Sequence, residues 1–145
     1  MPQVLAYIRA RREPEDIEFV DCIARTSFLY YSRAEDLDHA FITRHTCLPG
    51  CLRRDLRKVV GKRVWVISNR VPSPVPRRGK SGAMLSCEEV VTGMLDQVRP
   101  RVDGVHLRSG MRFYLRGDIG VSAWLYDLRQ VSPEALVGST FCDQK

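Results

Sequence analysis

Four side chains of the types that bind zinc fall within thirteen residues, in the order His39, His45, Cys47 and Cys51. Imidazole nitrogen and thiolate sulfur are ligands that zinc prefers in proteins. However, the spacing differs from the paired C-x2-C arrangement of established zinc modules, and His39 falls in a segment with a helical pattern. We therefore predict no metal centre here. We interpret the cysteines as buried or partly exposed thiols and His39 as a helix residue.

A nucleophilic role for Cys47 or Cys51 is a second chemistry to consider, because arginine-rich surroundings lower the pKa of a thiol and favour the reactive thiolate. The sequence places no orienting group and no oxyanion site beside either cysteine. We predict that the chain is not an enzyme and uses no cofactor. An enzyme acting on a phosphorylated substrate stays open as a further class, because the loop at Ser81 and Gly82 could cradle a phosphate.

Positive charge is concentrated between Cys51 and Lys80, where ten basic residues accompany a single acid, Asp55. This stretch carries about +9, whereas the whole chain carries +6. Charge of one sign gathered in one region is typical of a protein with an anionic partner. The alternatives are a solvated face, or salt bridges to the acidic clusters at residues 13–21 and 35–38. The predicted phosphate contacts are Arg53, Arg54, Arg57, Lys58, Lys62, Arg77, Arg78 and Lys80.

The last third of the chain alternates apolar and other residues between positions 105 and 125, which predicts a three-stranded antiparallel meander. One side of this meander would present the arginines and aromatic residues Arg112, Tyr114, Arg116 and Trp124. Aromatic rings beside arginines are the surface on which nucleic-acid-binding proteins stack bases and neutralise phosphates. The alternative is that a helix covers this side and buries Trp124.

The composition indicates an ordinary globular protein. A chain of 145 residues is the size of one domain, and no apolar run approaches the roughly 20 residues that cross a bilayer. The N-terminus lacks the charge order of a signal peptide. Five cysteines are an odd number without framework spacing, which favours reduced thiols. We therefore expect an intracellular protein, cytoplasmic or nuclear, with no membrane partner.

The patterns place these residues on a series of elements. We expect a strand at 4–8, a helix starting at Pro14 and continuing through Ala24, and a helix opened by a capping box of Ser32 and Glu35 and ended near Leu48-Pro49-Gly50. The segment 27–31 could be helix or strand. The later elements are an amphipathic helix over 52–60, a strand over 64–67, an exposed basic proline-rich loop at 71–82, a helix over 86–98 capped by Ser86 and Glu89, and a short helix from Ser132.

Two short resemblances involve the same residues. The run VWVISNRVP at 64–72 is similar to the opening strand and loop of trehalose-phosphate synthases, where it implies a loop that holds phosphates. The run from Leu48 to Ile67 resembles the oligonucleotide-binding segment of the translation initiation factors 1A, which implies an RNA-binding barrel. The first family's catalytic domain is about three times this chain's length, so we do not carry over its activity. The second favours RNA as the ligand.

The resulting prediction is an α+β fold in one domain spanning residues 1–145, with three or four helices packed on a mostly antiparallel sheet that ends in the meander. We predict a non-enzymatic nucleic-acid-binding subunit that prefers RNA to DNA. The alternative is a protein-interaction or scaffold subunit of a larger complex, perhaps homodimeric, that docks on an acidic protein partner.

Overall fold

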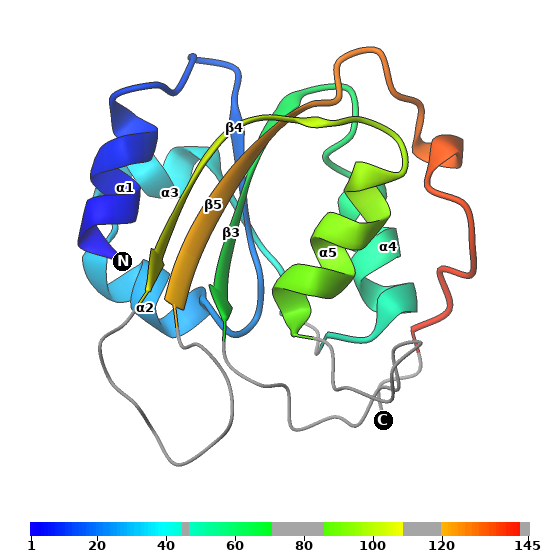
Figure 1. Cartoon of the computed structure of the whole chain (residues 1–145), viewed down its shortest axis with the longest axis horizontal. Coiled ribbons are helices and arrows are strands. Elements are labelled where there is room, and N and C mark those ends of the chain that lie inside the picture. The colour runs from blue at the N-terminus through cyan, green and yellow to red at the C-terminus, as the bar shows by residue number, and fades with distance from the viewer. Residues whose placement is uncertain (45–46, 71–85, 109–119, 143–145) are drawn as a thin grey trace.

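The computed structural model describes residues 1–44, 47–70, 86–108 and 120–142. In these ranges the chain forms five α-helices, a short 3-10 helix and one five-stranded sheet in the order β2-β1-β3-β5-β4 (Figure 1). The elements are α1 (Pro2–Arg9), β1 (Ile17–Val20), α2 (Arg25–Tyr31), α3 (Ala34–His39), β2 (Ala40–Ile42), α4 (Pro49–Arg57), β3 (Arg63–Arg70), α5 (Cys87–Asp96), β4 (Arg101–Arg108), β5 (Gly120–Asp127) and η1 (Pro133–Ala135).

The sheet is mixed. Strand β1 pairs in parallel with β2 and with β3, whereas β5 pairs antiparallel with β3 and with β4. The α+β class is therefore confirmed, but the sheet is not mostly antiparallel, because its β2-β1-β3 half is parallel. In this half the carboxyl ends of three strands meet at one edge, which we call the carboxyl edge.

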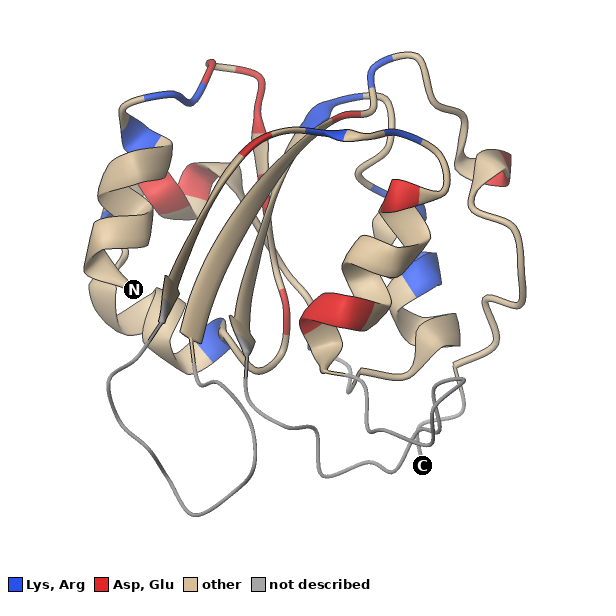
Figure 2. Cartoon of the chain, in the orientation of Figure 1, with Lys and Arg blue, Asp and Glu red and all other residues tan. Residues whose placement is uncertain are grey.

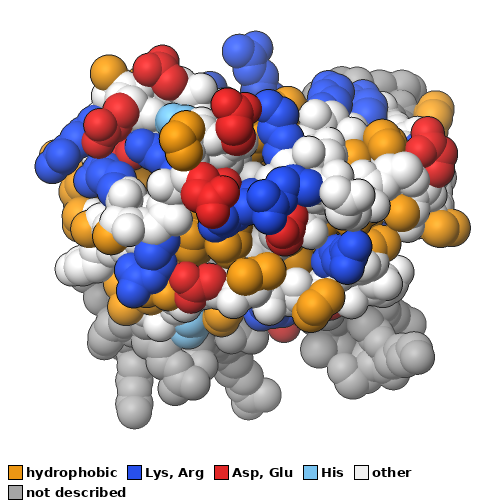
Figure 3. All heavy atoms as spheres, turned by 90° about the horizontal axis from the view of Figure 1, so that it is seen from above, with side chains coloured by type: hydrophobic (Ala, Val, Ile, Leu, Met, Phe, Trp, Pro, Cys, Tyr) orange, Lys and Arg blue, Asp and Glu red, His pale blue; other side chains and the backbone are white. Residues whose placement is uncertain are grey.

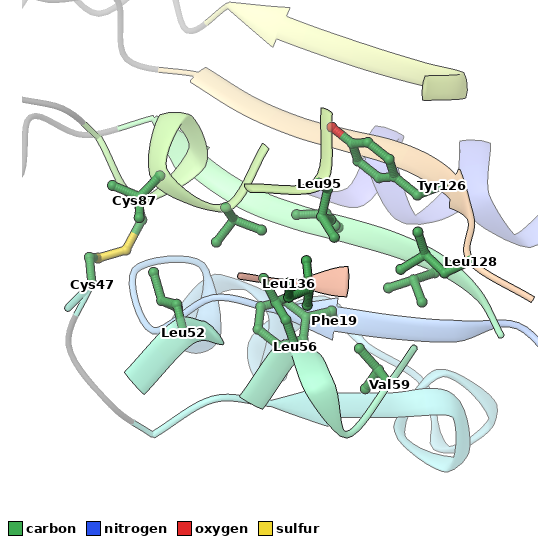
Figure 4. Close-up of a cluster of buried hydrophobic side chains, with 14 residues drawn as sticks. Phe19, Cys47, Leu52, Leu56, Val59, Cys87, Leu95, Tyr126, Leu128 and Leu136 are labelled. Atoms are coloured by element: carbon green, nitrogen blue, oxygen red, sulfur yellow. A yellow bond between two sulfur atoms is a disulfide. The ribbon is translucent and has the colours of Figure 1, made fainter. Parts of the chain in front are cut away.

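Helices cover both faces of the sheet (Figure 1). On one face, α4 and α5 pack side chains such as Leu56 and Leu95 against Phe19, Val66 and Tyr126 of the strands (Figure 4). On the other face, α1 and α2 pack against a second cluster that includes Trp65 and Leu125. Both faces of the central strand β3 are thus buried, as its apolar sequence predicts.

The prediction of a strand at residues 4–8 is wrong, because this segment belongs to helix α1. The buried residues Val4, Leu5 and Ile8 follow the one-turn spacing of a helix, and Pro2 stands in its first turn. A short apolar run fits a strand or a helix equally well in sequence. The packing of α1 against β4 and β5 decides between them here.

The prediction of a helix from Pro14 to Ala24 is also wrong, because Ile17–Val20 is strand β1. This strand lies between β2 and β3, with Phe19 opposite Phe41 and Val66. The acid Glu18 obscured the strand in the sequence. It is fully buried and forms an ion pair with Arg12, with 2.5 Å between the Nη1 and Oε1 atoms.

The next segment is shifted from its predicted bounds. Residues 25–31 form helix α2, and helix α3 begins after Arg33, whose backbone N–H donates to the Asp36 carboxylate at 2.8 Å. The predicted capping box of Ser32 and Glu35 is therefore one residue early. Pro49 begins α4 instead of ending the preceding helix, in keeping with the fixed φ of proline at the first helical position.

The central part of the prediction is confirmed. Strand β3 and helix α5 form where their patterns place them, helix α4 begins and ends three residues before the predicted 52–60, and Ser86 and Glu89 make the predicted capping box at 3.2 and 2.7 Å. Gly61 adopts a φ of +89°, the left-handed conformation that favours glycine after a helix. The short C-terminal helix is present as η1.

The predicted meander is confirmed in part. Strands β4 and β5 pair directly with one another from Arg101 opposite Tyr126 to Arg108 opposite Gly120, so no third strand lies between them. The predicted middle strand and the basic loop at 71–82 lie outside the described residues. The resemblance to an oligonucleotide-binding barrel does not hold, because β3 lies in the centre of an open sheet with helices on both faces.

Candidate nucleic-acid interface and thiol cluster

Helix α4 has one buried side and one cationic side. Leu52 and Leu56 are fully buried in the cluster beneath it, and Asp55 is nearly so. The apolar residues therefore fix the rotation of the helix and direct its basic residues away from the sheet. The charges at its C-terminal end also complement the helix dipole.

Two arginines of α4 bind backbone carbonyls of the C-terminal segment at residues 136–142, which we call the C-terminal strap. The Arg57 Nη2 atom donates to the Leu136 carbonyl at 2.7 Å, and the Arg53 Nη1 atom donates to the Ser139 carbonyl at 2.7 Å. A disulfide joins Cys51 to Cys142. These acceptors are neutral, so among the described residues no carboxylate bound to Arg53 or Arg57 offsets the positive charge.

The strap approaches α4 so closely that glycine is required. A Cβ atom at Gly50 would lie 2.1 Å from the Phe141 carbonyl oxygen, and Gly138, which lies against the Arg53 guanidinium, has a φ of +126° that favours glycine. The strap thus holds Arg53 in position from one side. It leaves the side chain partly exposed.

The other cations of α4 share one acid. Asp55 accepts from the Thr43 hydroxyl at 2.7 Å and lies 3.7 Å from Arg54 Nε and 3.5 Å from Lys58 Nζ. Lys62 is exposed in the turn that follows. Since Asp55 is the only acid from residue 49 to residue 62, this segment carries about +4.

The structure does not bring all the predicted contacts together. The side chain of Trp124 lies against Gly104, donates from Nε1 to Glu88 at 2.8 Å, and has the Arg101 guanidinium 4.6 Å from its ring centroid. Helix α5 thus packs against Trp124, which is partly buried, in keeping with the alternative in which a helix covers this side of β5. The remaining predicted residues lie outside the described ranges: Arg77, Arg78, Lys80, Arg112, Tyr114 and Arg116.

Several arginines outside α4 bind carboxylates. Arg9 and Arg12 both contact the buried Asp36, at 2.5 and 3.3 Å, and Arg63 forms ion pairs with Glu13 and Asp16. Figure 2 shows basic residues of α1 close to acidic residues of α3, and the face in Figure 3 shows basic and acidic side chains interleaved. These arginines are locally neutralised.

Three cysteines meet at the carboxyl edge, and we call Cys22, Cys47 and Cys87 the thiol cluster. Cys22 follows β1, Cys47 precedes α4, and Cys87 is the first residue of α5. The Cys22 sulfur lies 3.6 Å from that of Cys47 and 3.9 Å from that of Cys87, which are joined as a disulfide (Figure 4). Burial raises the pKa of the Cys22 thiol to about 11, with a further contribution from the Asp21 charge.

Two buried carboxylates flank the thiol cluster. Asp21 is fully buried and accepts from the Ala24 backbone N–H at 2.7 Å, while Glu88 is 8% exposed and accepts from Trp124. Burial raises the pKa of Asp21 to about 6; the Ser68 hydroxyl and nearby backbone amides lower it, and the charge of Glu88 raises it further. Among the described residues, the Oε2 atom of Glu88 has no hydrogen-bond partner.

The four zinc-type residues considered from the sequence are not assembled into one site. His39 contacts the Asp16 carbonyl through Nδ1 at 2.9 Å, Cys47 and Cys51 belong to different disulfides, and His45 lies outside the described residues. The prediction of reduced thiols also differs from the structure, which has two disulfides. Their partners are 40 and 91 residues apart, so no local spacing could reveal them.

The sequence prediction missed Cys22 and Cys87 as neighbours of Cys47. Cys22 comes two residues after the end of β1, and Cys87 directly follows the helix cap Ser86. The parallel pairing places the end of β1 beside β3, and the fold brings the Cys22 sulfur to 3.9 Å from that of Cys87. Neither relation can be found from the local sequence.

The fold and these two sites define an α+β protein with a mixed sheet between helical layers, a cationic helix and a thiol cluster at one sheet edge. Compared with protein-family models, curated proteins and solved structures, the chain shows no significant match. Among the described helices, none has the length and apolar character needed to span a bilayer.

Proposed function

We propose that the protein is a non-enzymatic nucleic-acid-binding subunit that binds RNA in preference to DNA through the cationic side of α4. The contacts are Arg53, Arg54, Arg57, Lys58 and Lys62, extended by the basic residues of the 71–82 loop. Such a protein works inside the cell, in the cytoplasm or nucleus.

The observation that carries this proposal is the choice of hydrogen-bond acceptor. Arg53 and Arg57 donate to backbone carbonyls, so their charges are not cancelled as those of Arg9 and Arg12 are. Both side chains remain partly exposed, and an arginine fork with free donors suits phosphate oxygens.

The test is fluorescence anisotropy of a labelled single-stranded RNA, and of a DNA duplex, across a salt series. Phosphate contacts make the logarithm of the affinity fall linearly with the logarithm of salt concentration, with a slope of about −0.7 per contact for single strands. We expect a variant with glutamine at the four basic positions of the 53–58 segment to reduce the slope by up to about 3.

A matched control removes the same amount of charge elsewhere. Arg11, Arg25, Arg33 and Arg99 are exposed and belong to segments other than α4, so their change to glutamine should leave most of the slope intact. Because Arg53 and Arg57 also hold the strap, a second variant, K58E/K62E, tests the cationic side of α4 while leaving both strap contacts in place. Equal losses in the control and α4 variants would overturn the proposed interface.

The alternative, a protein-interaction subunit docking on an acidic partner, is favoured by exposed apolar side chains. Tyr30 of α2 is 79% exposed, and Val137 and Phe141 of the strap are 81% and 76% exposed. Apolar surface beside positive charge is typical of a protein interface. Absence of RNA and DNA binding at low salt, together with a stable oligomer in solution, would support this function instead.

A further inference from the structure

The thiol cluster has no part in the proposed nucleic-acid contacts. Its three sulfur atoms lie within 4.8 Å of one another, although Cys22 is 25 residues from Cys47 and 65 from Cys87. Cys22 contacts both members of the disulfide and is not itself bonded to either. The three sulfurs form a triangle at the carboxyl edge.

We propose that, when the Cys47–Cys87 disulfide is reduced, Cys22, Cys47 and Cys87 bind a thiophilic divalent cation of the zinc type. A tetrahedral zinc site with zinc–sulfur bonds of about 2.3 Å places its sulfurs about 3.8 Å apart. The two distances from Cys22 are 3.6 and 3.9 Å. Once the disulfide is reduced, the sulfurs of Cys47 and Cys87 can move apart to the same separation.

The fourth position is open to water, because among the described residues the group of mutually close ligand atoms holds the three sulfurs alone. The Oε2 atom of Glu88 is buried without a hydrogen-bond partner among the described residues, and the carboxylate of Asp21 is buried beside the Ser68 hydroxyl. Each carboxylate is the chain neighbour of a cluster cysteine. Buried polar atoms without partners are rare, and a cation or its bound water would satisfy them. Zinc accepts carboxylate oxygen or water beside thiolates.

The first turn of α5 favours the thiolate form that a metal needs. Cys87 stands at the first position of this ten-residue helix, next to its cap Ser86. The positive end of the helix dipole lowers the cost of an anionic sulfur there. Three sulfur ligands select zinc-type ions over magnesium and calcium, which prefer oxygen.

The metal and the disulfide exclude one another, because both use Cys47 and Cys87. A thiol reductant supplies two electrons and two protons to the disulfide and is itself oxidised to a disulfide. The three thiols then release three protons as their sulfurs bind the cation. In a reducing compartment the thiol form is maintained, whereas in an oxidising one the disulfide persists.

The test uses the full chain treated with a thiol reductant under anaerobic conditions. We expect one zinc ion per chain in competition with a chromophoric chelator, and an intense thiolate-to-cobalt charge-transfer band when Co2+ replaces zinc. Excess Mg2+ should not displace either ion. Alkylation with peptide mapping should show that zinc protects Cys22, Cys47 and Cys87, but not Cys51 or Cys142.

Two variants separate this site from the other cysteines. C22S removes one ligand and should weaken zinc binding by more than the roughly 10–100-fold that loss of an outer-shell partner costs. The matched control, C51S/C142S, leaves the thiol cluster as the only cysteines and should still bind one zinc ion.

Several results would overturn the proposal. These are no zinc uptake by the reduced chain, unchanged affinity in C22S, and a Cys47–Cys87 disulfide that survives reductant and zinc together. The alkylation pattern of the chain without substitutions tests whether zinc binds these three cysteines even if C22S fails to fold.

Discussion

The arginines around α1 and two of the three arginines of α4, Arg53 and Arg57, use the same guanidinium group with different acceptors. Near α1, Arg9 and Arg12 bind the buried carboxylates of Asp36 and Glu18. On α4, Arg53 and Arg57 bind neutral carbonyls of the strap. The first arrangement fixes the packing of α1, α3 and β1. The second fixes the strap while the helix stays positively charged.

The kind of acceptor therefore decides whether an arginine acts as a structural partner or as a surface charge. A carboxylate acceptor makes an arginine a structural partner whose charge is cancelled locally. A carbonyl acceptor satisfies some of the five donors of an arginine and leaves its charge available to an anionic ligand. Counting arginines in a sequence therefore overestimates the cationic surface, and the acceptors show which ones contribute.

The largest effect should come from Asp36→Ala. Asp36 is fully buried and accepts from Arg9, Arg12 and the Arg33 backbone N–H. Removing it deprives Arg9 of its hydrogen-bond acceptor and leaves Arg12 with Glu18 alone, so we expect unfolding free energy to fall by about 3–5 kcal/mol in urea denaturation. The exposed Asp38 of the same helix provides the control, and Asp38→Ala should change stability by less than about 0.5 kcal/mol. A loss below about 1 kcal/mol for Asp36→Ala would mean that the network behaves like a surface ion pair.

The sequence predicts the middle of the molecule well. Helix α4, strand β3 and helix α5 each combine a clear period with a recognisable end, such as Gly61 or the Ser86 cap. The N-terminal region was predicted less well, because its elements are short and its charges are buried. Glu18 looks like a helix-face residue until the partner Arg12 is known.

The two candidate sites also differ in how far the sequence predicts them. The cationic side of α4 follows from local periodicity, so Arg53 and Arg57 could be assigned from sequence. Their carbonyl acceptors could not, because the strap is more than 75 residues away. The thiol cluster depends on parallel strand pairing between distant segments, and no local pattern reports that pairing.

A second prediction concerns the stability of the fold at acidic pH. For Asp36, burial acts to raise the pKa, but the Arg9 hydrogen bond, the Arg33 amide and the charges of Arg9 and Arg12 outweigh it and lower the pKa. A carboxylate with a lowered pKa in the folded state stabilises the protein above about pH 4, the ordinary value for aspartate, and this stabilisation is lost as the pH falls through the folded-state pKa. The Arg129 hydrogen bond similarly lowers the pKa of Asp127 to about 2.

Denaturation curves measured between pH 7 and pH 2 should therefore show stability declining below about pH 4. The penalty of Asp36→Ala should shrink over the same range, because protonation removes the same charge as the substitution. A penalty that stays constant with pH would show that the Asp36 carboxylate does not stabilise the fold through its charge.

The smallest effect should come from Arg57→Ala. Its 2.7 Å bond to the Leu136 carbonyl has no titrating acceptor, so we expect a loss of about 1 kcal/mol that does not vary between pH 7 and pH 3. If Arg57 also contacts a phosphate, the salt slope for single-stranded RNA should decrease by about 0.7. Arg57→Lys retains the charge and should keep the slope while weakening the strap contact. An unchanged slope in Arg57→Ala, with the stability loss present, would make Arg57 a strap residue alone and move the boundary of the cationic interface toward Lys58 and Lys62.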